Sequence, residues 1–337
     1  MRSFFFFSLL FCLVVALGAV AWFGLYVATP GEGDGQVTVV IPKGAGVRTI
    51  KTLLVRQGII KDDIRFLILA RVVKEGTQLK AGEFRVPQGL RPLEVLRFLA
   101  QAKPVQYRVT VPEGLTMFQI AKVFARDHWV DPQKFLKLCQ NQEFIQSLGL
   151  TVNSLEGYLF PETYSLVRDQ VDEKMVVTIM VNRFLEVWEQ LEKPENISLT
   201  RHQLVTLASI VEKETGSAEE RPRIASVFYN RLNKGMRLQS DPTTIYGITN
   251  FNGNLTRADL QAETPYNTYV ITGLPPGPIC NPGRAAFEAV LHPEKTSLYY
   301  FVSKNNGSHY FSTTLKEHNR AVNTYQKSRN RKKIRHK

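Results

Sequence analysis

Two glutamates, Glu212 and Glu214, stand at the end of an apolar helical pattern, where a carboxyl group could act as an acid or a base. The segment 204–214 reads LVTLASIVEKE, and its apolar residues have the spacing of a helix that faces a core. Burial beside apolar residues disfavours the charged form and raises a carboxyl pKa. A carboxylic acid that stays protonated near neutral pH is what a general acid requires. These two residues are therefore candidates for acid–base chemistry.

Helix rotation favours Glu214 over Glu212. At about 100° per residue, Glu214 follows Ile210 by one turn and Leu207 by two turns, so it continues the apolar column at its edge. Glu212 projects roughly 160° away from Glu214. We expect Glu214 to be half buried and Glu212 to be more exposed. The alternative at this point is that both are ordinary salt-bridging residues on a solvated helix face.

Other segments have the composition of loops that could surround such a group. The segment EGYLFPETY at 156–164 mixes aromatic rings with carboxylates and suits a loop lining a sugar cleft, or an aromatic core loop. Asp241 and Pro242 suit the cap and first turn of a helix. The proline-rich run at 273–279 predicts a rigid loop. Segments 299–302 and 309–312 predict two strands around an Asn-Gly turn, and 315–327 predicts a final helix.

The N-terminus predicts a membrane span. Residues 4–28 are almost wholly apolar and uncharged, which is long enough for a hydrocarbon core of about 30 Å. Arg2 precedes the span and favours a cytoplasmic N-terminus. Trp22 and Tyr26 stand near the far end, as interface aromatics do. A cleaved signal peptide is the alternative, because the segment 19–21 resembles a cleavage site. Either way, most of the chain lies outside the cytoplasm.

A small α+β subdomain follows a Gly-rich segment, 29–36, which predicts a flexible linker. The segment 39–44 predicts a strand and a Pro-x-Gly turn before a helix, and 109–114 repeats the pattern. A second helix from Asp62 or Asp63 to about Lys74 and a strand at 82–86 give the order β-α-α-β, followed by a helix at 92–102. This order resembles LysM, a small carbohydrate-binding module. A structural subdomain without a ligand is the alternative.

Composition excludes several kinds of chemistry. The chain has no His-Glu-x-x-His, no Cys/His cluster, no Gly-x-Ser-x-Gly and no phosphate-binding Gly loop, so we expect neither metal nor cofactor. Cys139 and Cys280, outside the span, form no disulfide framework. The net charge is +13, with much of the excess in the tail 327–337. Because this tail is expected to lie outside the cytoplasm, we expect it to bind no nucleic acid. It is a solvated tail, or it meets anionic headgroups or wall polymers.

Several long motifs in order resemble the YceG-like family of endolytic murein transglycosylases. They are EGYLFPETY at 156–164, LASIVEKET at 207–215, ASVFYNRLNKGMRLQSDPTTIYG at 225–247 and YNTYVITGLPPGPICNPG at 266–283, with HPEKTSLYYFV and HYFSTTLKEHN after them. The resemblance extends from the span to about Lys327 and leaves out the basic tail. Cys280 is a departure, because the family tends to a small residue there.

The resemblance implies a lytic transglycosylase, a carbon–oxygen lyase, that is held by a single span in the inner membrane with its catalytic domain in the periplasm. It would cleave the β-1,4 bond between N-acetylmuramic acid (MurNAc) and N-acetylglucosamine (GlcNAc) in nascent glycan strands. The product would end in 1,6-anhydro-MurNAc, which would terminate elongation, and peptidoglycan synthases would be partners. The family's catalytic glutamate maps onto Glu214. Residues that could hold the sugars, from motif position and polarity, are Glu156, Tyr158, Glu162, Gln239, Asp241, Tyr246, Tyr266 and Asn267.

The expected fold class is α+β, with a single N-terminal transmembrane helix, a small β-α-α-β LysM-like subdomain and a larger α+β catalytic domain. The boundaries are 1–3 for the cytoplasmic end, 4–28 for the span, 29–36 for the linker, 37–103 for the subdomain, 104–327 for the catalytic domain and 328–337 for the basic tail. Two alternatives remain. One is a muramidase-type hydrolase with Glu162 or Asp241 as its second carboxylate. The other is a non-enzymatic scaffold that binds the wall and recruits synthases.

Overall fold

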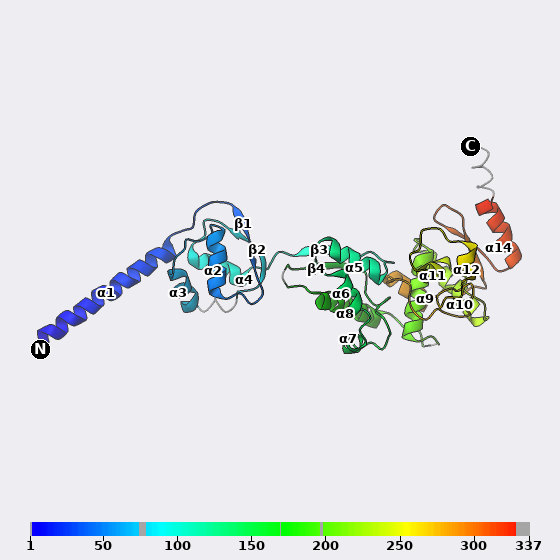
Figure 1. The fold of residues 1–337 in the computed structure, drawn as a ribbon, viewed down its shortest axis with the longest axis horizontal. Helices are drawn as coiled ribbons and strands as arrows, with labels where there is room; N and C mark the ends of the chain where they lie inside the picture. Colours follow the sequence, from blue (N-terminus) through cyan, green and yellow to red (C-terminus); the bar gives the residue numbers. More distant parts are fainter. Residues whose placement is uncertain (1, 74–78, 169, 196–197, 328–337) are drawn as a thin grey trace, which may run out of the picture. The chain divides into compact units, whose positions relative to one another are not determined.

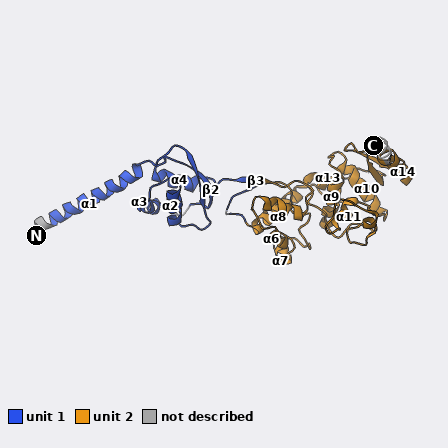
Figure 2. Cartoon of the chain, turned by 45° about the horizontal axis from the view of Figure 1, so that its top comes forward, with its two compact units in different colours: residues 1–108, 165–171 blue, residues 109–164, 172–337 orange. Residues whose placement is uncertain are grey.

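The computed structural model describes residues 2–73, 79–168, 170–195 and 198–327. The chain divides into two compact units, with residues 1–108 and 165–171 in unit 1 and residues 109–164 and 172–337 in unit 2 (Figure 2). The described residues form helices and three two-stranded sheets, which confirms the expected α+β class. The predicted basic tail, 328–337, lies outside the described residues.

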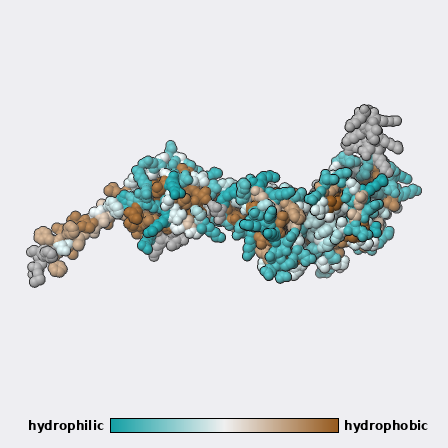
Figure 3. Space-filling model, viewed as in Figure 1, coloured by the Kyte–Doolittle hydropathy of each residue, from teal (hydrophilic) through white to brown (hydrophobic). Residues whose placement is uncertain are grey.

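Helix α1 (Arg2–Ala28) is the apolar N-terminal segment (Figure 1). The most apolar part of its stretch Phe5–Ala28 has a mean hydropathy of 2.5, and the stretch is long and apolar enough to cross a membrane. Figure 3 shows it as a mostly brown, apolar rod. Its last turns differ from the rest, because Tyr26 is only 8% exposed and Phe23 and Val27 pack against the core of unit 1. The end of the apolar helix is thus part of the folded unit.

The rest of unit 1 has the predicted β-α-α-β order followed by a helix. Strand β1 pairs antiparallel with β2, with Gln36 opposite Pro87 and Ile41 opposite Gly82. Inward-facing Val39 and Ile41 alternate with exposed residues, as the two-residue period of a strand requires. The likeness to LysM and its carbohydrate binding stay predictions. The elements are β1 (Gln36–Ile41), α2 (Val47–Arg56), α3 (Arg65–Val72), β2 (Gly82–Pro87) and α4 (Pro92–Gln101).

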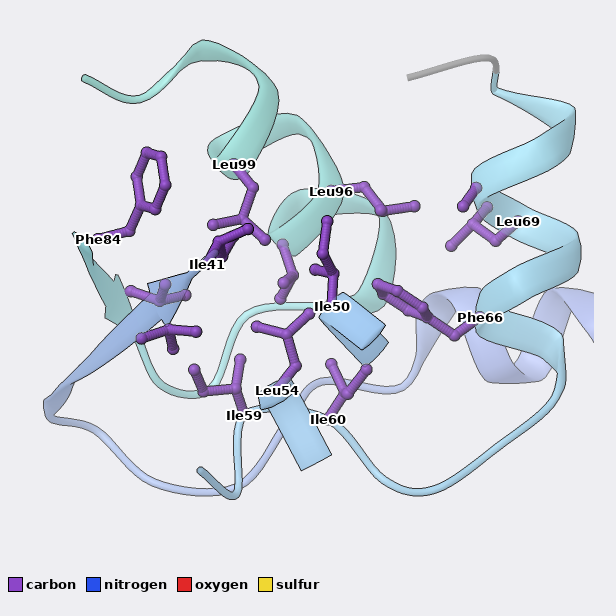
Figure 4. Close-up of a cluster of buried hydrophobic side chains, with 14 of the residues drawn as sticks. Ile41, Ile50, Leu54, Ile59, Ile60, Phe66, Leu69, Phe84, Leu96 and Leu99 are labelled. Atoms are coloured by element: carbon purple, nitrogen blue, oxygen red, sulfur yellow. The ribbon is translucent and has the colours of Figure 1, made fainter. Parts of the chain in front are cut away.

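The core of unit 1 gathers aliphatic and aromatic side chains from all of these elements (Figure 4). Leu54 from α2, Phe66 from α3 and Leu96 from α4 are fully buried. Each such side chain contributes about 1.5–3 kcal/mol relative to an exposed one. This core also anchors the segment expected to be a flexible linker. Backbone hydrogen bonds hold it, from Gly31 N to the Leu90 oxygen at 3.0 Å and from Gln88 N to the Gly35 oxygen at 2.8 Å.

The remaining elements build the region around the candidate site. Helix α9 packs against α10, α11 and α13. The predicted pair of strands at 299–312 is confirmed as an antiparallel pair, with Tyr300 opposite Ser312. In chain order the elements are β3 (Tyr107–Thr110), α5 (Met117–Arg126), α6 (Pro132–Leu138), α7 (Gln142–Ser147), β4 (Thr163–Leu166), α8 (Glu173–Gln190), α9 (Arg201–Glu214), α10 (Arg221–Asn233), α11 (Asp241–Tyr246), α12 (Arg257–Gln261), α13 (Arg284–Leu291), β5 (Tyr300–Ser303), β6 (His309–Ser312), α14 (Leu315–Val322) and the π-helical turn η2 (Asn323–Lys327).

Two of these elements differ from the sequence prediction. The segment 156–164, expected to be a loop throughout, enters strand β4 at Thr163 and pairs with β3. Burial alternates along β4, which is a strand pattern too short to stand out in the sequence. The final helix is α-helical only to Val322 and then winds more loosely through η2 to Lys327.

Candidate active site

Helix α9 carries Glu214 on its last turn. The helix begins at a capping box in which Thr200 and Gln203 each accept a hydrogen bond from the other's backbone N–H. Every residue from Leu204 to Val211 is buried, so the helix is surrounded by protein over this length. Thr215 leaves the helical conformation. Glu214 therefore stands at the exit of a buried helix, which fixes its backbone and lets its side chain reach a surface cleft.

Glu214 is protonated more readily than an ordinary glutamate. The Ser240 hydroxyl donates a hydrogen bond of 2.5 Å to its Oε1. Burial raises the pKa of Glu214 to about 7, against the opposing effect of that hydrogen bond. The negative charge of Asp241 raises the pKa further, and Arg231 lowers it. A carboxyl group that titrates near neutral pH can both give and take a proton under physiological conditions.

Glu214 opens into a cleft of about 450 Å³. Ligand sites of small molecules commonly have volumes of about 300–1,000 Å³, so this cleft has room for a ligand. Its walls combine carboxylates, amides, aromatic rings and histidines, which suits a polar ligand with flat apolar faces. The lining residues are Glu214, Arg231, Leu238, Gln239, Asp241, Tyr269, Tyr300, Phe301, Val302, Ser303, His309, Leu315, His318, Val322 and Gln326.

The segment 238–241 is held rigidly beside Glu214. Gln239 has a positive φ of 50°, an uncommon conformation that directs the chain into α11. Thr268 fixes this turn, because its carbonyl accepts from Gln239 N at 3.1 Å and its Oγ1 accepts from Ser240 N at 2.9 Å. On the cleft wall, the Tyr269 hydroxyl donates to Asp241 Oδ1 at 2.6 Å. The prediction that Asp241 is the helix cap was wrong, because Ser240 occupies the N-cap position and Asp241 is the first residue of α11. The Asp241 carboxylate is instead oriented by Tyr269 of the 266–283 motif.

Arg231 joins this turn to the strand pair. Its guanidinium is buried and donates from Nη1 to the Leu238 oxygen at 2.6 Å and from Nε to the Tyr299 oxygen at 2.7 Å. Burial lowers its pKa. A buried cation needs such partners, because desolvation is costly. The sequence reasoning did not single out Arg231, Ser240 or Tyr269. The sequence signal for them was that all three lie within the motifs 225–247 and 266–283, which also contain predicted site residues.

Three of the nine predicted residues line this cleft, namely Glu214, Gln239 and Asp241. The other six are not among its lining residues. Their contacts favour roles in positioning the chain over direct contact with a ligand in this cleft.

Glu156 is an internal carboxylate. It is 3% exposed and accepts hydrogen bonds from Met117 N at 3.0 Å, Asn281 Nδ2 at 2.8 Å and the Tyr246 hydroxyl at 3.1 Å. Burial raises its pKa to about 7, and these donors oppose that shift. Asn281 is 125 positions away in sequence. Glu156 thus connects segments that are far apart along the chain.

The remaining predicted residues are also engaged in the fold. Tyr158 is fully buried, and its hydroxyl lies 2.9 Å from His202 Nδ1. Glu162 accepts from Arg183 Nε at 2.5 Å. Asn267 is fully buried and donates to the Ala262 oxygen at 2.7 Å. The last two are in ring contact, since the Tyr246 and Tyr266 ring centroids lie 4.9 Å apart with their planes inclined by 57°.

Glu212 does not face solvent, contrary to what the helix period suggests. Its side chain is only 7% exposed, and Oε1 lies 3.4 Å from Arg221 Nη2 while Oε2 accepts from Gly283 N at 3.2 Å. Burial raises its pKa. The helix period placed Glu212 opposite the apolar stripe, but α10 and the start of α13 cover that side as well. The helix period identifies a solvent-exposed face only when the rest of the protein covers one side of the helix and leaves the other side open.

Comparison with known proteins connects this site to a family. The YceG-like family model matches residues 39–324. A Bacillus subtilis protein named endolytic murein transglycosylase is 34% identical over 336 residues, covering 94% of this chain and 92% of that protein. A Streptococcus pneumoniae protein of the same name is 32% identical over 320 residues, covering 85% of this chain and 58% of the longer relative.

A solved structure agrees with these relatives. A YceG-like protein from Listeria monocytogenes, solved at 2.6 Å, superposes with a TM-score of 0.59 at 33% identity. The match covers 86% of this chain and 100% of that one. The family model spans α9, the Ser240–Asp241 turn and the strand pair, so all elements that position Glu214 fall within it. The chain belongs to the YceG-like family.

Proposed function

We propose that this protein is a membrane-anchored endolytic murein transglycosylase that cleaves the MurNAc-β-1,4-GlcNAc bond within glycan strands. The observation that carries the proposal is Glu214, a carboxyl group with a pKa of about 7 at the wall of a 450 Å³ cleft. The names of the relatives support the substrate class. The polar and aromatic walls of the cleft support a sugar ligand, because rings such as Tyr269 and Tyr300 can pack on pyranose faces.

One carboxyl group can serve both proton transfers. Protonated Glu214 gives its proton to the glycosidic oxygen as the bond from that oxygen to the muramoyl C1 breaks, and the oxygen leaves as the GlcNAc 4-hydroxyl. The muramoyl C6 oxygen then bonds to C1, and its proton passes to the Glu214 carboxylate. The acid is regenerated, no water is consumed and the strand ends in 1,6-anhydro-MurNAc. Intramolecular attack benefits from the high effective concentration of the C6 hydroxyl.

Ser240 and Asp241 complete the electrostatics of this proposal. The Ser240 hydrogen bond holds the Glu214 carboxyl group in one orientation, so the proton has a fixed direction. Asp241 shares the cleft and carries a negative charge. Positive charge develops on the sugar ring when the glycosidic bond breaks, and a nearby carboxylate stabilises that charge.

The presence of Asp241 favours hydrolysis as the second candidate. Most glycosidases have two carboxyl groups in one cleft, and the second activates water or attacks C1. Hydrolysis would leave reducing ends instead of anhydro ends. Glu162, the other carboxylate considered for this role, is paired with Arg183 and is absent from the cleft lining.

The anchor and partners belong to the same proposal. Helix α1 would span the cytoplasmic membrane, with its N-terminal end inside and the rest of the chain on the side of the cell wall. A cleaving enzyme held at the membrane would meet strands close to their site of synthesis. Cleavage there would terminate glycan elongation, and peptidoglycan synthases are the expected neighbours.

The test is digestion of purified glycan strands by wild-type, Glu214→Gln and Glu162→Gln protein, with mass spectrometry of the strand ends. We expect wild type and Glu162→Gln to release anhydro-MurNAc ends, and Glu214→Gln to lose at least about 100-fold in rate, the usual size of a general acid–base contribution. Glu162→Gln is the control because it changes the same residue type outside the cleft. Reducing ends from wild type would favour hydrolysis, and unchanged cleavage by Glu214→Gln would refute its role.

A further inference from the structure

Helix α3 exposes apolar residues on its outer side. Ile64, Ile68 and Val72, which we call the α3 stripe, are 60%, 43% and 67% exposed. Residues four positions apart lie above one another on a helix, so the three form one continuous line. The inner side of α3, including Phe66 and Leu69, is buried in the core of unit 1 (Figure 4). A helix that is apolar on both sides is normally covered on both sides.

Arg65 fixes α3 beside the end of α1. Its Nη1 donates to the Trp22 carbonyl oxygen at 2.6 Å, and its guanidinium carbon lies 4.5 Å and 4.7 Å from the ring centroids of Trp22 and Tyr26. Asp63 holds the same guanidinium through an ion pair of 2.7 Å. Charge-assisted bonds and two cation–π contacts give α3 a defined position on α1. The α3 stripe is therefore tied to the level of Trp22.

That level corresponds to the edge of a bilayer. From Phe5 to Trp22 the helix rises by about 25 Å at 1.5 Å per residue. This approaches the thickness of the hydrocarbon core, about 30 Å, so Trp22 would lie near the boundary of that core when α1 spans the membrane. Tryptophan is enriched at this boundary. Beyond Trp22 the side chains of Phe23, Tyr26 and Val27 are used by the core of unit 1 instead.

We propose that the α3 stripe inserts into the boundary between headgroups and acyl chains of the membrane that α1 spans. The occupant is the bilayer, because the stripe lies on the helix whose Arg65 is held against Trp22, beside the last exposed turns of α1. Arg71 is exposed on α3, and its long side chain can reach lipid phosphates while the isoleucines face the acyl chains. Unit 1 would then rest on the membrane in one orientation. The inference depends on the proposed anchor.

The test places a fluorophore on single cysteines of the full chain in phosphatidylglycerol-containing nanodiscs. Cys12→Ser removes the exposed native thiol, while Cys139 and Cys280 are buried and are left in place. An environment-sensitive label is attached at Ile68→Cys and, in the control, at Val40→Cys. Val40 is a matched control because it is an apolar residue of unit 1 with 42% exposure. Emission is measured with brominated phospholipids and with aqueous iodide.

We expect the label at position 68 to lose emission with brominated lipids and to be protected from iodide, and the label at position 40 to behave in the opposite way. Iodide quenching at position 68 equal to that at position 40 would overturn the inference. Protection from both quenchers would also overturn it, since a second copy of the protein would then cover the stripe. In a separate sample, a label on native Cys12 tests the anchor alone. Its quenching by brominated lipids would show that α1 lies in the bilayer, even where the α3 stripe does not insert.

Discussion

At the residue scale, the proton affinity of Glu214 depends on a balance between burial and two neighbours that act in opposite directions. Burial sets the pKa near 7, the Ser240 hydroxyl stabilises the charged form, and the Asp241 charge destabilises it. Because Ser240 and Asp241 belong to one turn, a single short segment both raises and lowers the pKa of Glu214. The proposed general acid must be protonated, so kcat/KM should fall as pH rises through the pKa of Glu214.

Ser240→Ala should shift this alkaline limb to higher pH. The substitution removes a hydrogen bond that lowers the pKa of Glu214, so the protonated form persists further into the alkaline range. The measurement is the pH profile of kcat/KM on glycan strands. Ser240→Thr keeps the hydroxyl and is the matched control, with a limb close to that of wild type. A limb that does not move in Ser240→Ala would contradict the assigned effect.

Asp241→Asn should shift the same limb to lower pH, the opposite direction. Removing the carboxylate charge removes a cause of the raised pKa, so Glu214 ionises earlier. Tyr269→Phe is the control, because it removes the hydrogen bond to Asp241 and keeps the charge. An electrostatic effect should move the alkaline limbs of Ser240→Ala and Asp241→Asn in opposite directions. General damage to the cleft would lower the rate of both variants without moving their limbs apart.

The sequence could place Glu214 at the edge of a buried helix face but could not predict its surroundings. Local helix geometry chose it because the position depends only on the spacing to Leu207 and Ile210. Glu212 failed by the same method, since its burial depends on Gly283, 71 positions further on. Glu156 shows the same limit, because its partner Asn281 is far along the chain. Local patterns predict which side of an element is apolar, and long-range packing decides which polar groups become buried.

At the element scale, the loop 156–162 and the proline-rich loop 273–279 fit together only because Gly157 has no side chain. Its φ is +86°, and a Cβ there would lie 2.5 Å from Pro278 Cγ and 2.8 Å from Val205 Cγ1. Both neighbours are rigid, so neither can move away cheaply. This contact seats the two loops against α9, the helix that carries Glu214.

Gly157→Ala should lower the free energy of unfolding by about 2–5 kcal/mol, from an unfavourable backbone conformation together with steric overlap. Gly149→Ala is the matched control, because Gly149 has a similar φ of +77° and open space where the methyl group would lie. It should cost only the conformational part, about 1 kcal/mol. Denaturant unfolding of both variants measures the difference. Equal losses would show that the Pro278 contact contributes nothing.

At the scale of the whole molecule, the apolar N-terminal helix has two parts that the sequence shows as one. Its composition is uniform from Phe5 to Ala28, so hydropathy predicts a single span. In the fold its last turns become part of the core of unit 1, through Phe23, Tyr26 and Val27. Hydropathy cannot distinguish a part that packs on protein from a part that could lie in lipid, because both environments favour the same residue types.

A chain that begins at Ala21 should therefore be more stable in unit 1 than one that begins at Pro30. The longer chain keeps Tyr26 and its apolar neighbours, and their loss should cost about 2–4 kcal/mol by the removal of buried surface and the contacts it fills. Calorimetric unfolding measures this, and the transition of unit 2 is the internal reference. Tyr26→Ala in the longer chain should reproduce much of the loss. Equal midpoints for the two chains would mean that the helix end packs on unit 1 without stabilising it.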